Sequence, residues 1–528
     1  MAAPQITALD GMHFDVVIVG AGINGASTAQ HLSAAGYRVL IVDQGDFANG
    51  ATSRSSRLLH CGLRHLASGS NFCTTLLRPD RLARSLGTVR ADMRARDEIV
   101  RTIPDRLRPI NICLPIYTDD TYAPWQLDAA FAVLRMASPI GVPLDYRRYS
   151  AKQLNQVPIA PWLRDPDRLQ SVAVFREYLF DWPERIALDA LFDAHRMGAQ
   201  INNYTRVEKL DRLESTGHWR LSLRASEYVG PSKQSIAAEQ AQVTAVVVLN
   251  LAGAWVDDII TNTGKPVEPR CTGIKGIHIS VRLPDEFTDW GLFAFNSIGE
   301  PLYCLPSNGM HYIGLTRTPF DGNISDVSAT DQEIDWMIAE TNRCLPQLAI
   351  THDDILFSWA GVNPLTRDPE DPLGSREIKI HDLATDGLPG MLALTGGAIM
   401  THRLVANRLL RAVSSRVAAS GLAQDLNFQA INTCGEQNAD RIESDAFSIS
   451  TATLKRCARD EQPASLADLL MRRLGAGWSS DQGLALARRA AEAAAQDLGW
   501  SKARIDAEVQ AYEGHLKTAR RRPNPLSA

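Results

Sequence analysis

The sequence lacks several features that would place it in a particular class of protein. It has no run of about eighteen apolar residues free of charge, so we expect no membrane-spanning helix. Its eight cysteines include no CxxC pair, which argues against a disulfide framework or a zinc site and fits a reducing cytosol. Residues 1–13 have neither a basic start nor an apolar stretch, and they predict no secretory signal.

Positive charge is not in excess either. The formal net charge is -5, and no basic stripe with interleaved aromatic residues runs through the chain. We therefore expect no nucleic-acid partner. The 528 residues, of which 45% are hydrophobic and 22% charged, are typical of a globular protein with several domains.

A strand, a glycine-rich turn, a helix and a second strand open the chain. Residues 14–19 (FDVVIV) are a short apolar run, and the GxGxxG turn of residues 20–25 (GAGING) follows directly. After a segment with helical spacing, residues 37–43 (YRVLIVD) predict a second buried strand that ends on Asp43. In such a unit the start of the helix binds the pyrophosphate of a dinucleotide, and the acid accepts hydrogen bonds from a ribose.

Two later segments predict further strands of the same sheet. One is the apolar run from residue 245 to 252, before Gly253, and the other is residues 391–395, before Gly396 and Gly397. The fold class is therefore α/β, with a discontinuous dinucleotide-binding domain. We expect that domain in residues 12–78, 166–272 and 353–415, a mostly helical insertion in 79–165, an inserted antiparallel sheet in 273–352, and a helical C-terminal domain in 425–528.

Residues 51–66 (ATSRSSRLLHCGLRHL) hold three arginines, two histidines and no acid. A solvated surface usually mixes both signs of charge, so this stretch is expected to meet an anionic ligand. Because it follows Asp43, it would lie along the diphosphate and the isoalloxazine of a flavin. His60 and Arg64 would share one face of a helical turn. The alternative is a set of ordinary surface salt bridges.

At this point the sequence resembles the FAD-dependent glycerol-3-phosphate dehydrogenases of the D-amino-acid-oxidase superfamily. The segments that carry the resemblance are, in order, GAGINGAS, ATSRSSRLLHCGLRHL, IKGIHI, WAGVNPL and LTGGAIMTHR. The resemblance covers nearly the whole chain. It implies a Rossmann-like FAD-binding domain, an inserted α+β substrate domain and a C-terminal helical domain. It also implies hydride transfer from glycerol 3-phosphate to flavin N5, with electrons passed to quinone or another acceptor.

The resemblance and the motifs together give the expected site residues. Those expected to bind FAD are Gly20, Gly22, Ile23, Asn24, Gly25, Asp43, Thr52, Ser53, Arg54, Ser56, Leu59, Gly253, Gly396, Gly397, Ala398 and Met400. Those expected on the substrate side are His60, Arg64, His402, Arg317 and Arg376. His60 and His402 are the alternatives for the base that takes the hydroxyl proton.

Several positions depart from the family pattern. Asn363 stands where the family has a phosphate-binding arginine, and Ala398 stands where it has a lysine beside the substrate. Because a buried phosphate needs cations, Arg317 is a candidate replacement. The substrate is then glycerol 3-phosphate or a close phosphorylated polyol. The alternatives are the same flavin chemistry on a hydroxy acid, polyol or amine, and a flavin-binding protein without dehydrogenase activity.

The cellular context follows from the same resemblance. We expect a cytoplasmic protein, and attachment to the inner face of the cell membrane stays open because family members often reach quinone there. Residues 103–117 (IPDRLRPINICLPIY) are either a membrane-surface element or ordinary core. Residues 520–522 (RRR) are either a solvated tail or a lipid contact. The oligomeric state also stays open, with a homodimer as one alternative.

Overall fold

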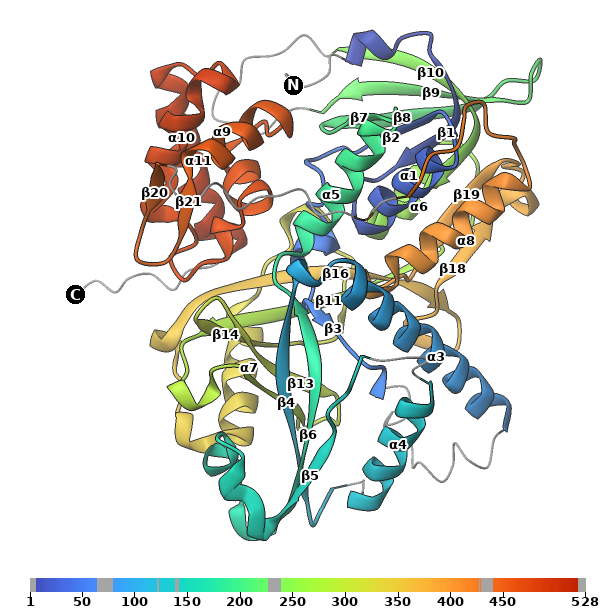
Figure 1. The fold of residues 1–528 in the computed structure, drawn as a ribbon. Helices are drawn as coiled ribbons and strands as arrows, with labels where there is room; N and C mark the ends of the chain where they lie inside the picture. Colours follow the sequence, from blue (N-terminus) through green and yellow to red (C-terminus); the bar gives the residue numbers. More distant parts are fainter. Residues whose placement is uncertain are drawn as a thin grey trace.

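The computed structural model of the chain describes residues 6–63, 79–120, 123–137, 142–226, 239–426, 428 and 440–520. Two β-sheets and a group of helices near the C-terminal end form the three parts of the molecule (Figure 1). The smaller sheet carries the dinucleotide-binding pattern, and the larger sheet lies beside it. The C-terminal helices lie at one side of the molecule.

The first sheet is mostly parallel. Within the described residues it has eight strands, with the central order β18-β19-β10-β1-β2-β7, and the β8–β9 hairpin pairs with β10. Only β18 and the hairpin run antiparallel to their neighbours. The strands are His13–Val19 (β1), Val39–Val42 (β2), Gln200–Asn202 (β7), Thr205–Arg212 (β8), Trp219–Ala225 (β9), Gln240–Asn250 (β10), Lys379–Asp382 (β18) and Met391–Thr395 (β19).

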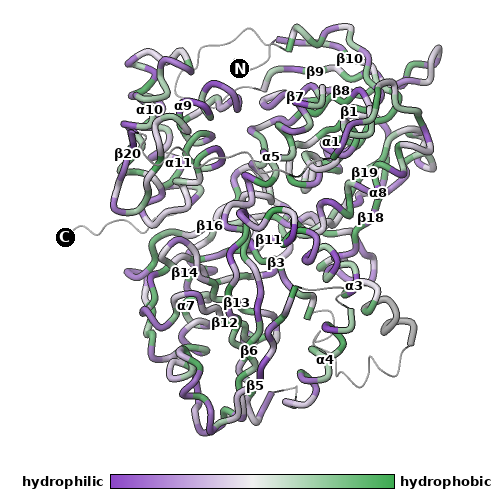
Figure 2. The backbone as a smooth tube through the Cα atoms, in the orientation of Figure 1, coloured by the Kyte–Doolittle hydropathy of each residue, from purple (hydrophilic) through white to green (hydrophobic). Residues whose placement is uncertain are grey.

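Both faces of this sheet are buried, which explains its continuous apolar strands. Val16 and Ile18 pack under α1, α5 and α8, whereas Val17 and Val19 pack with the β8–β9 hairpin and α6 on the other face. Hydrophobic stretches accordingly lie inside this part of the molecule in Figure 2. The helices are Ile23–Ala34 (α1), Pro183–Arg196 (α5), Val256–Thr261 (α6) and His402–Ser414 (α8).

The second sheet is larger and mostly antiparallel. Its eleven described strands follow the order β17-β16-β11-β14-β13-β12-β4-β6-β3, with β15 on β11 and β5 on β6. The strands are Leu58–Leu59 (β3), Leu107–Tyr117 (β4), Arg147–Ser150 (β5), Leu169–Phe180 (β6), Cys271–Val281 (β11), Trp290–Phe295 (β12), Pro301–Ser307 (β13), Met310–Gly314 (β14), Thr318–Pro319 (β15), Ile355–Asp368 (β16) and Asp371–Ser375 (β17).

Helices cover both faces of the second sheet, and others form the C-terminal region. α7 (Asp331–Cys344) packs on one face, and α3 (Pro79–Thr102) and α4 (Pro124–Ala137) pack on the other. The C-terminal region has its own core. Its elements are the hairpin of Arg441–Glu443 (β20) and Ser448–Ser450 (β21), α9 (Thr451–Asp460), the π-helical turn η15 (Asp468–Arg473), α10 (Leu484–Leu498) and α11 (Lys502–Ala519).

Four strands join a different sheet from the one that the predicted ranges imply. β3, β6, β16 and β17 fall in the ranges 12–78, 166–272 and 353–415, yet all four belong to the second sheet. The range 79–165 was expected to be mostly helical, but it also holds β4 and β5. Local patterns do not show which sheet a buried strand joins, because an apolar run fits either one.

Residues 103–117 form core and not a surface element. They include β4, which lies between β12 and β6, and its last six residues are all buried. The membrane-surface interpretation of this stretch is therefore wrong, because its apolar side chains fill the space under α3 and α4 and on the opposite face. None of the described helices combines the length and the apolar character that crossing a bilayer requires.

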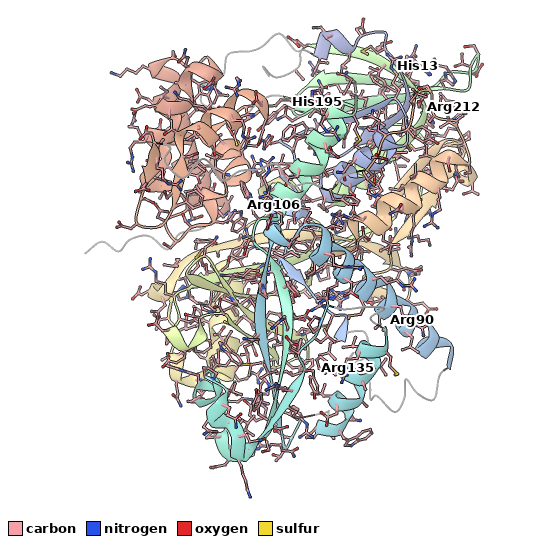
Figure 3. The ribbon with its side chains drawn as sticks, viewed as in Figure 1. His13, Arg90, Arg106, Arg135, His195 and Arg212 are labelled. Atoms are coloured by element: carbon pink, nitrogen blue, oxygen red, sulfur yellow. The ribbon has the colours of Figure 1, made fainter. Side chains whose placement is uncertain are left out.

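Buried ion pairs join the three parts. Arg106, which leads into β4, lies where the two sheets meet and donates to Asp189 of α5 at 2.8 Å (Figure 3). Arg185 donates to Asp189 and to Glu461 of the C-terminal region, both at 2.7 Å. Arg520 was interpreted as part of a solvated tail, but it is buried and its guanidinium lies 3.7 Å from the ring of Trp478.

Replacing Phe131 with alanine should destabilise the second part of the molecule. Phe131 of α4 is fully buried and stacks on Tyr146, with ring centroids 4.0 Å apart. Phe131→Ala should lower the free energy of unfolding by about 3–5 kcal/mol in urea denaturation. Trp125 in the same helix is 60% exposed, so Trp125→Ala should change it by less than about 0.5 kcal/mol. Equal losses from both variants would contradict this packing.

Candidate functional site

The turn after β1 brings the start of α1 close to the sheet. Gly20 has φ +106, and a Cβ there would lie 2.5 Å from the carbonyl oxygen of Leu251. A Cβ on Gly25 would lie 1.9 Å from the carbonyl oxygen of Gly20, so both positions require glycine. Gly22 is the N-cap of α1 and provides no side-chain cap. The first turn of α1 is therefore suited to an anionic group.

Asp43 follows β2 and faces this turn. Its Oδ2 accepts the N–H of Ala21 at 2.7 Å, and its Oδ1 accepts the N–H of Gly45 at 2.9 Å. Burial raises the pKa of Asp43 to about 6, although both amide donors oppose the shift. Each carboxylate oxygen has a further lone pair, so Asp43 can also accept hydrogen bonds from ribose hydroxyls.

Two other glycine turns reach the same edge, because β1, β10 and β19 are parallel. Gly253 follows β10 with φ +61, and Gly396 and Gly397 follow β19 with φ +73 and +80. Asn24, in the first turn of α1, donates through Nδ2 to the carbonyl oxygen of Gly397 at 2.9 Å. The fold thus brings together three segments that are far apart in the sequence.

Residues 51–60 connect this edge with the second sheet. They begin with η2 (Ala51–Arg54), where Thr52 Oγ1 accepts the N–H of Ile23 at 3.0 Å. The hydroxyl of Ser53 donates back to the preceding turn. Thr52 therefore satisfies one N–H at the start of α1 and attaches the arginine- and serine-rich stretch to the dinucleotide-binding turn.

The second sheet holds the next part of the stretch. The carbonyl oxygen of Ser56 accepts a hydrogen bond from the Tyr312 hydroxyl at 2.7 Å, and its Oγ lies 3.2 Å from Nε2 of His278. Immediately afterwards, β3 pairs with β6. Residues 51–60 therefore cross from the first sheet to the second.

Arg54 packs on a part of the second sheet that has no side chains. Gly361 of β16 pairs with Gly276 of β11, and a Cβ on Gly361 would lie 2.8 Å from Cβ of Arg54. Within the described ranges, the Arg54 guanidinium has neither a hydrogen bond nor an ion pair, and burial lowers its pKa to about 10. A partly buried cation of this kind fits an anionic ligand.

Asn363 and Arg317 lie on either side of β11. Asn363 follows Gly361 by two residues on the same face of β16, and it is exposed. Arg317 directly precedes β15, and its NH1 lies 3.4 Å from Oε1 of Glu300. Its Nε is buried and lacks a hydrogen-bond partner in the part of the chain that the structure describes. Arg317 is therefore one strand away from the position where the family arginine is missing.

His60 lies just after β3, beside a small hollow of about 10 Å³. Its Nδ1 accepts the N–H of Gly62 at 3.1 Å and lies 3.9 Å from Oδ2 of Asp92 on α3. The other residues that line the hollow are Leu58, Leu63, Ile112, Phe175, Glu177, Phe293 and Tyr303. Arg64, which was predicted to act with His60, lies outside the described residues.

Glu177 of β6 is a residue of this hollow that the sequence analysis did not single out. Its Oε1 accepts the N–H of Cys61 at 2.8 Å, and its Oε2 lies 3.7 Å from Nε of Arg96. Burial raises the pKa of Glu177 to about 7, against the opposing effect of Arg96. An acid that titrates near neutral pH beside His60 is a candidate for proton transfer. In the sequence, the feature that could have identified Glu177 is an acidic residue within an apolar strand.

His402 and Arg376 do not line the hollow beside His60. His402 begins α8, is buried, and donates through Nδ1 to the carbonyl oxygen of Ile399 at 2.7 Å. Burial lowers its pKa to about 3, and Arg403 on α8 and His31 on α1 lower it further. Arg376 is exposed between β17 and β18. Of the two histidines considered as the base, His60 borders the hollow described above, whereas His402 is buried.

Three predicted flavin contacts have different surroundings. Leu59 and Met400 are buried in the core that α1 and α8 share, which gives no support to their contact with a ligand. Ala398 is exposed directly after the Gly396–Gly397 turn. A small side chain there leaves the approach to the turn open.

The arrangement at the sheet edge fits FAD. We propose that the 20–25 turn holds the pyrophosphate, Asp43 holds the ribose, and residues 52–56 with the 396–397 turn surround the flavin ring. One buried acceptor, Oδ1 of Asn24, lacks a partner among the described residues and lies beside this path. The helix start, the free acceptor and the cation of Arg54 match the polar parts of such a ligand.

Comparison with known proteins supports this interpretation. A family model described as "DAO: FAD dependent oxidoreductase" matches residues 15–403. The chain belongs to this family. This FAD-dependent oxidoreductase is 28% identical over 417 residues to a glycerol-3-phosphate dehydrogenase of Synechocystis. The aligned region covers 77% of the chain and 71% of that protein. It is 26% identical to an aerobic glycerol-3-phosphate dehydrogenase of Staphylococcus aureus, covering 80% of the chain and 70% of that protein.

Solved structures show the same fold. The oxidoreductase resembles a glycerol-3-phosphate dehydrogenase from Bacillus halodurans complexed with FAD, with a TM-score of 0.67, 20% identity and coverage of 97% and 96% of the two chains. It also resembles an L-alpha-glycerophosphate oxidase from Mycoplasma pneumoniae with FAD bound, with a TM-score of 0.59, 15% identity and coverage of 79% and 98%. The predicted cofactor and fold class are thus confirmed.

FAD binding should weaken in acid because of Asp43. With a pKa of about 6, the carboxyl is increasingly protonated below that pH, and the protonated form accepts hydrogen bonds less well. The Kd of the apoprotein for FAD, measured by flavin fluorescence, should therefore rise by up to about tenfold per pH unit below about pH 6.

The Asp43→Asn variant should bind FAD more weakly near pH 8 and should lose this dependence on pH. The control is Asp15→Asn, because Asp15 is also buried in β1 but accepts hydrogen bonds from Arg38 and Ser420 at the far end of the strand. A pH profile that survives in Asp43→Asn would contradict the role of Asp43.

Proposed function

We propose that this oxidoreductase converts glycerol 3-phosphate, or a close phosphorylated polyol, to the corresponding ketone. The observation that carries the proposal is the identity with the glycerol-3-phosphate dehydrogenase of Synechocystis, which extends over 77% of the chain. The bound FAD supplies the hydride acceptor. The electrons then pass to quinone or another acceptor. Membrane contact and a homodimer stay predictions.

His60 is the residue best placed to take the hydroxyl proton. In the structure Nδ1 accepts the N–H of Gly62, so for Nε2 to act as the base the proton of the neutral ring has to move to Nδ1 and the bond from Gly62 has to break. The carboxylate of Asp92, 3.9 Å from Nδ1, is the acid that would then stabilise the doubly protonated ring. Glu177 is a further proton acceptor at the same hollow.

A cation near Gly361 of the second sheet would hold the phosphate. Arg317 lies beyond β11 from Asn363. Its buried Nε has no hydrogen-bond partner within the described residues, so it can donate a charge-assisted hydrogen bond. Arg317 would then replace the cation missing at Asn363.

A different substrate class is favoured by the missing cations themselves. Asn363 and Ala398 are both exposed, and neither side chain can neutralise a phosphate. If no other cation serves, the same flavin chemistry would act on a hydroxy acid, an unphosphorylated polyol or an amine. If no substrate reduces the flavin, the protein binds FAD without dehydrogenase activity.

The first test is anaerobic reduction of the bound flavin. Glycerol 3-phosphate should bleach the visible flavin band of the purified protein. The His60→Gln variant, with the same flavin spectrum, should be slower by at least about 100-fold, because it loses a proton acceptor. If glycerol 3-phosphate has no effect while dithionite reduces the flavin, the proposed substrate is wrong. Hydroxy acids, polyol phosphates and amines are then screened.

Arg317→Ala should raise the KM for glycerol 3-phosphate by about 10- to 100-fold, because it removes a charge-assisted hydrogen bond. The flavin spectrum and the rate with dithionite should not change. The control is Arg367→Ala, because Arg367 lies on β16 with its side chain 48% exposed. An unchanged KM in Arg317→Ala would disprove the replacement of the missing cation.

A further inference from the structure

The loop between β2 and η2 contains a buried acid that has no part in the FAD contacts proposed above. Asp46 is 1% exposed, and three side chains donate to its two oxygens. Nδ2 of Asn203 donates to Oδ1 at 3.0 Å. The other two donors are Arg472 and Arg473, which belong to the C-terminal region.

Two consecutive arginines donate hydrogen bonds to this carboxylate. Arg473 donates through NH1 to Oδ2 of Asp46 at 2.8 Å and through NH2 to Oδ1 at 2.7 Å. Arg472 donates through Nε to Oδ2 at 2.5 Å, and its NH1 donates to Oδ1 of Asn49 in the same loop at 3.3 Å. The bidentate geometry sets the direction of the loop as well as its distance from η15.

The local structure of the C-terminal region is adapted to this contact. Both arginines lie at the end of η15, a π-helical turn, and such turns are rare and occur frequently at functional sites. Nε of Arg473 donates to the carbonyl oxygen of Glu461 at 2.9 Å, and Arg472 also pairs with Asp468. These contacts within the C-terminal region fix the positions of both arginine side chains.

The charges in the cluster are complementary. Burial alone would raise the pKa of Asp46, but Arg473 and Arg472 hold it at about 2, so the carboxylate is ionised at neutral pH. A buried ion pair often adds little net stability compared with apolar residues, because both charges lose their hydration. What such a cluster provides is a fixed geometry.

The loop that the arginines hold is joined to the cofactor-binding turn at both ends. It begins at Asp43, which bonds to Ala21, and the N–H of Ala48 donates to the carbonyl oxygen of Ala21 at 3.0 Å. Beyond the loop, Thr52 accepts the N–H of Ile23. A displacement of residues 43–50 would therefore move the side chains that face the ADP half of FAD.

We propose that the C-terminal region positions the FAD-binding loop, with Arg472 and Arg473 as positioning residues that act through Asp46. The C-terminal helices thus serve cofactor binding without touching the cofactor. This inference depends on FAD binding alone, so it stands or falls independently of the substrate that reduces the flavin.

The test compares two buried arginines that both face the C-terminal region. Arg473→Met removes the bidentate contact with the loop and keeps most of the side-chain volume. Arg185→Met is the matched control, because Arg185 is equally buried and joins Glu461 to Asp189 of α5, at 2.7 Å each, without a contact to the loop. The measurements are the Kd of each apoprotein for FAD, by flavin fluorescence, and the thermal unfolding temperature.

Both variants should lower the unfolding temperature, because each removes one of the charged partners of a buried carboxylate. Only Arg473→Met should weaken FAD binding, by about tenfold or more, whereas Arg185→Met should stay within about twofold of the original protein. Equal effects of the two variants on the Kd, or an unchanged Kd in Arg473→Met, would overturn the proposal. If either methionine variant fails to fold, Arg473→Lys and Arg185→Lys are judged by the same criteria.

Discussion

The parallel alignment of β1, β10 and β19 is the constraint on which the rest of the structure depends. It brings the turns at Gly20, Gly253 and Gly396 to one edge of the first sheet, although hundreds of residues separate them. The bond from Asn24 to the carbonyl oxygen of Gly397 then locks the first and last turns together. Only after this edge exists can the dinucleotide-binding turn, the ribose acceptor and the flavin-facing glycines act on one ligand.

The second sheet adds a surface to that edge, and residues 51–60 make the connection. Ser56 is bonded to His278 and Tyr312, and Arg54 lies against Gly361 of β16. Because Gly361 carries no side chain, the sheet can approach the loop closely there. Catalysis in such a site requires a substrate that is held between the cofactor and polar groups with fixed positions. The contacts of residues 51–60 with both sheets fix the positions of such groups.

Arginine and carboxylate pairs join the three parts of the molecule, alongside apolar contacts such as those of Leu107 and Phe180 with the core of the first sheet and of Trp478 with Trp359. The chain from Arg106 through Asp189 and Arg185 to Glu461 crosses all three parts, and Asp46 with Arg473 forms a second connection. Apolar contacts tolerate small shifts, whereas bidentate pairs in a low-dielectric interior fix orientation. This is the kind of joint expected where a cofactor loop has to keep one shape.

The sequence by itself determined the dinucleotide-binding unit, because GxGxxG and the following strand with Asp43 are local features with a single mechanical explanation. It also indicated His60 and Arg54, since both stand in one charged stretch. Only the tertiary structure decided that β6 and β16 join the second sheet, because a buried strand looks the same in either. It alone paired Asp46 with Arg473, 427 residues away, since no local pattern identifies a distant partner. It also separated His60, at a hollow, from His402, in the core, because burial depends on how the whole chain packs.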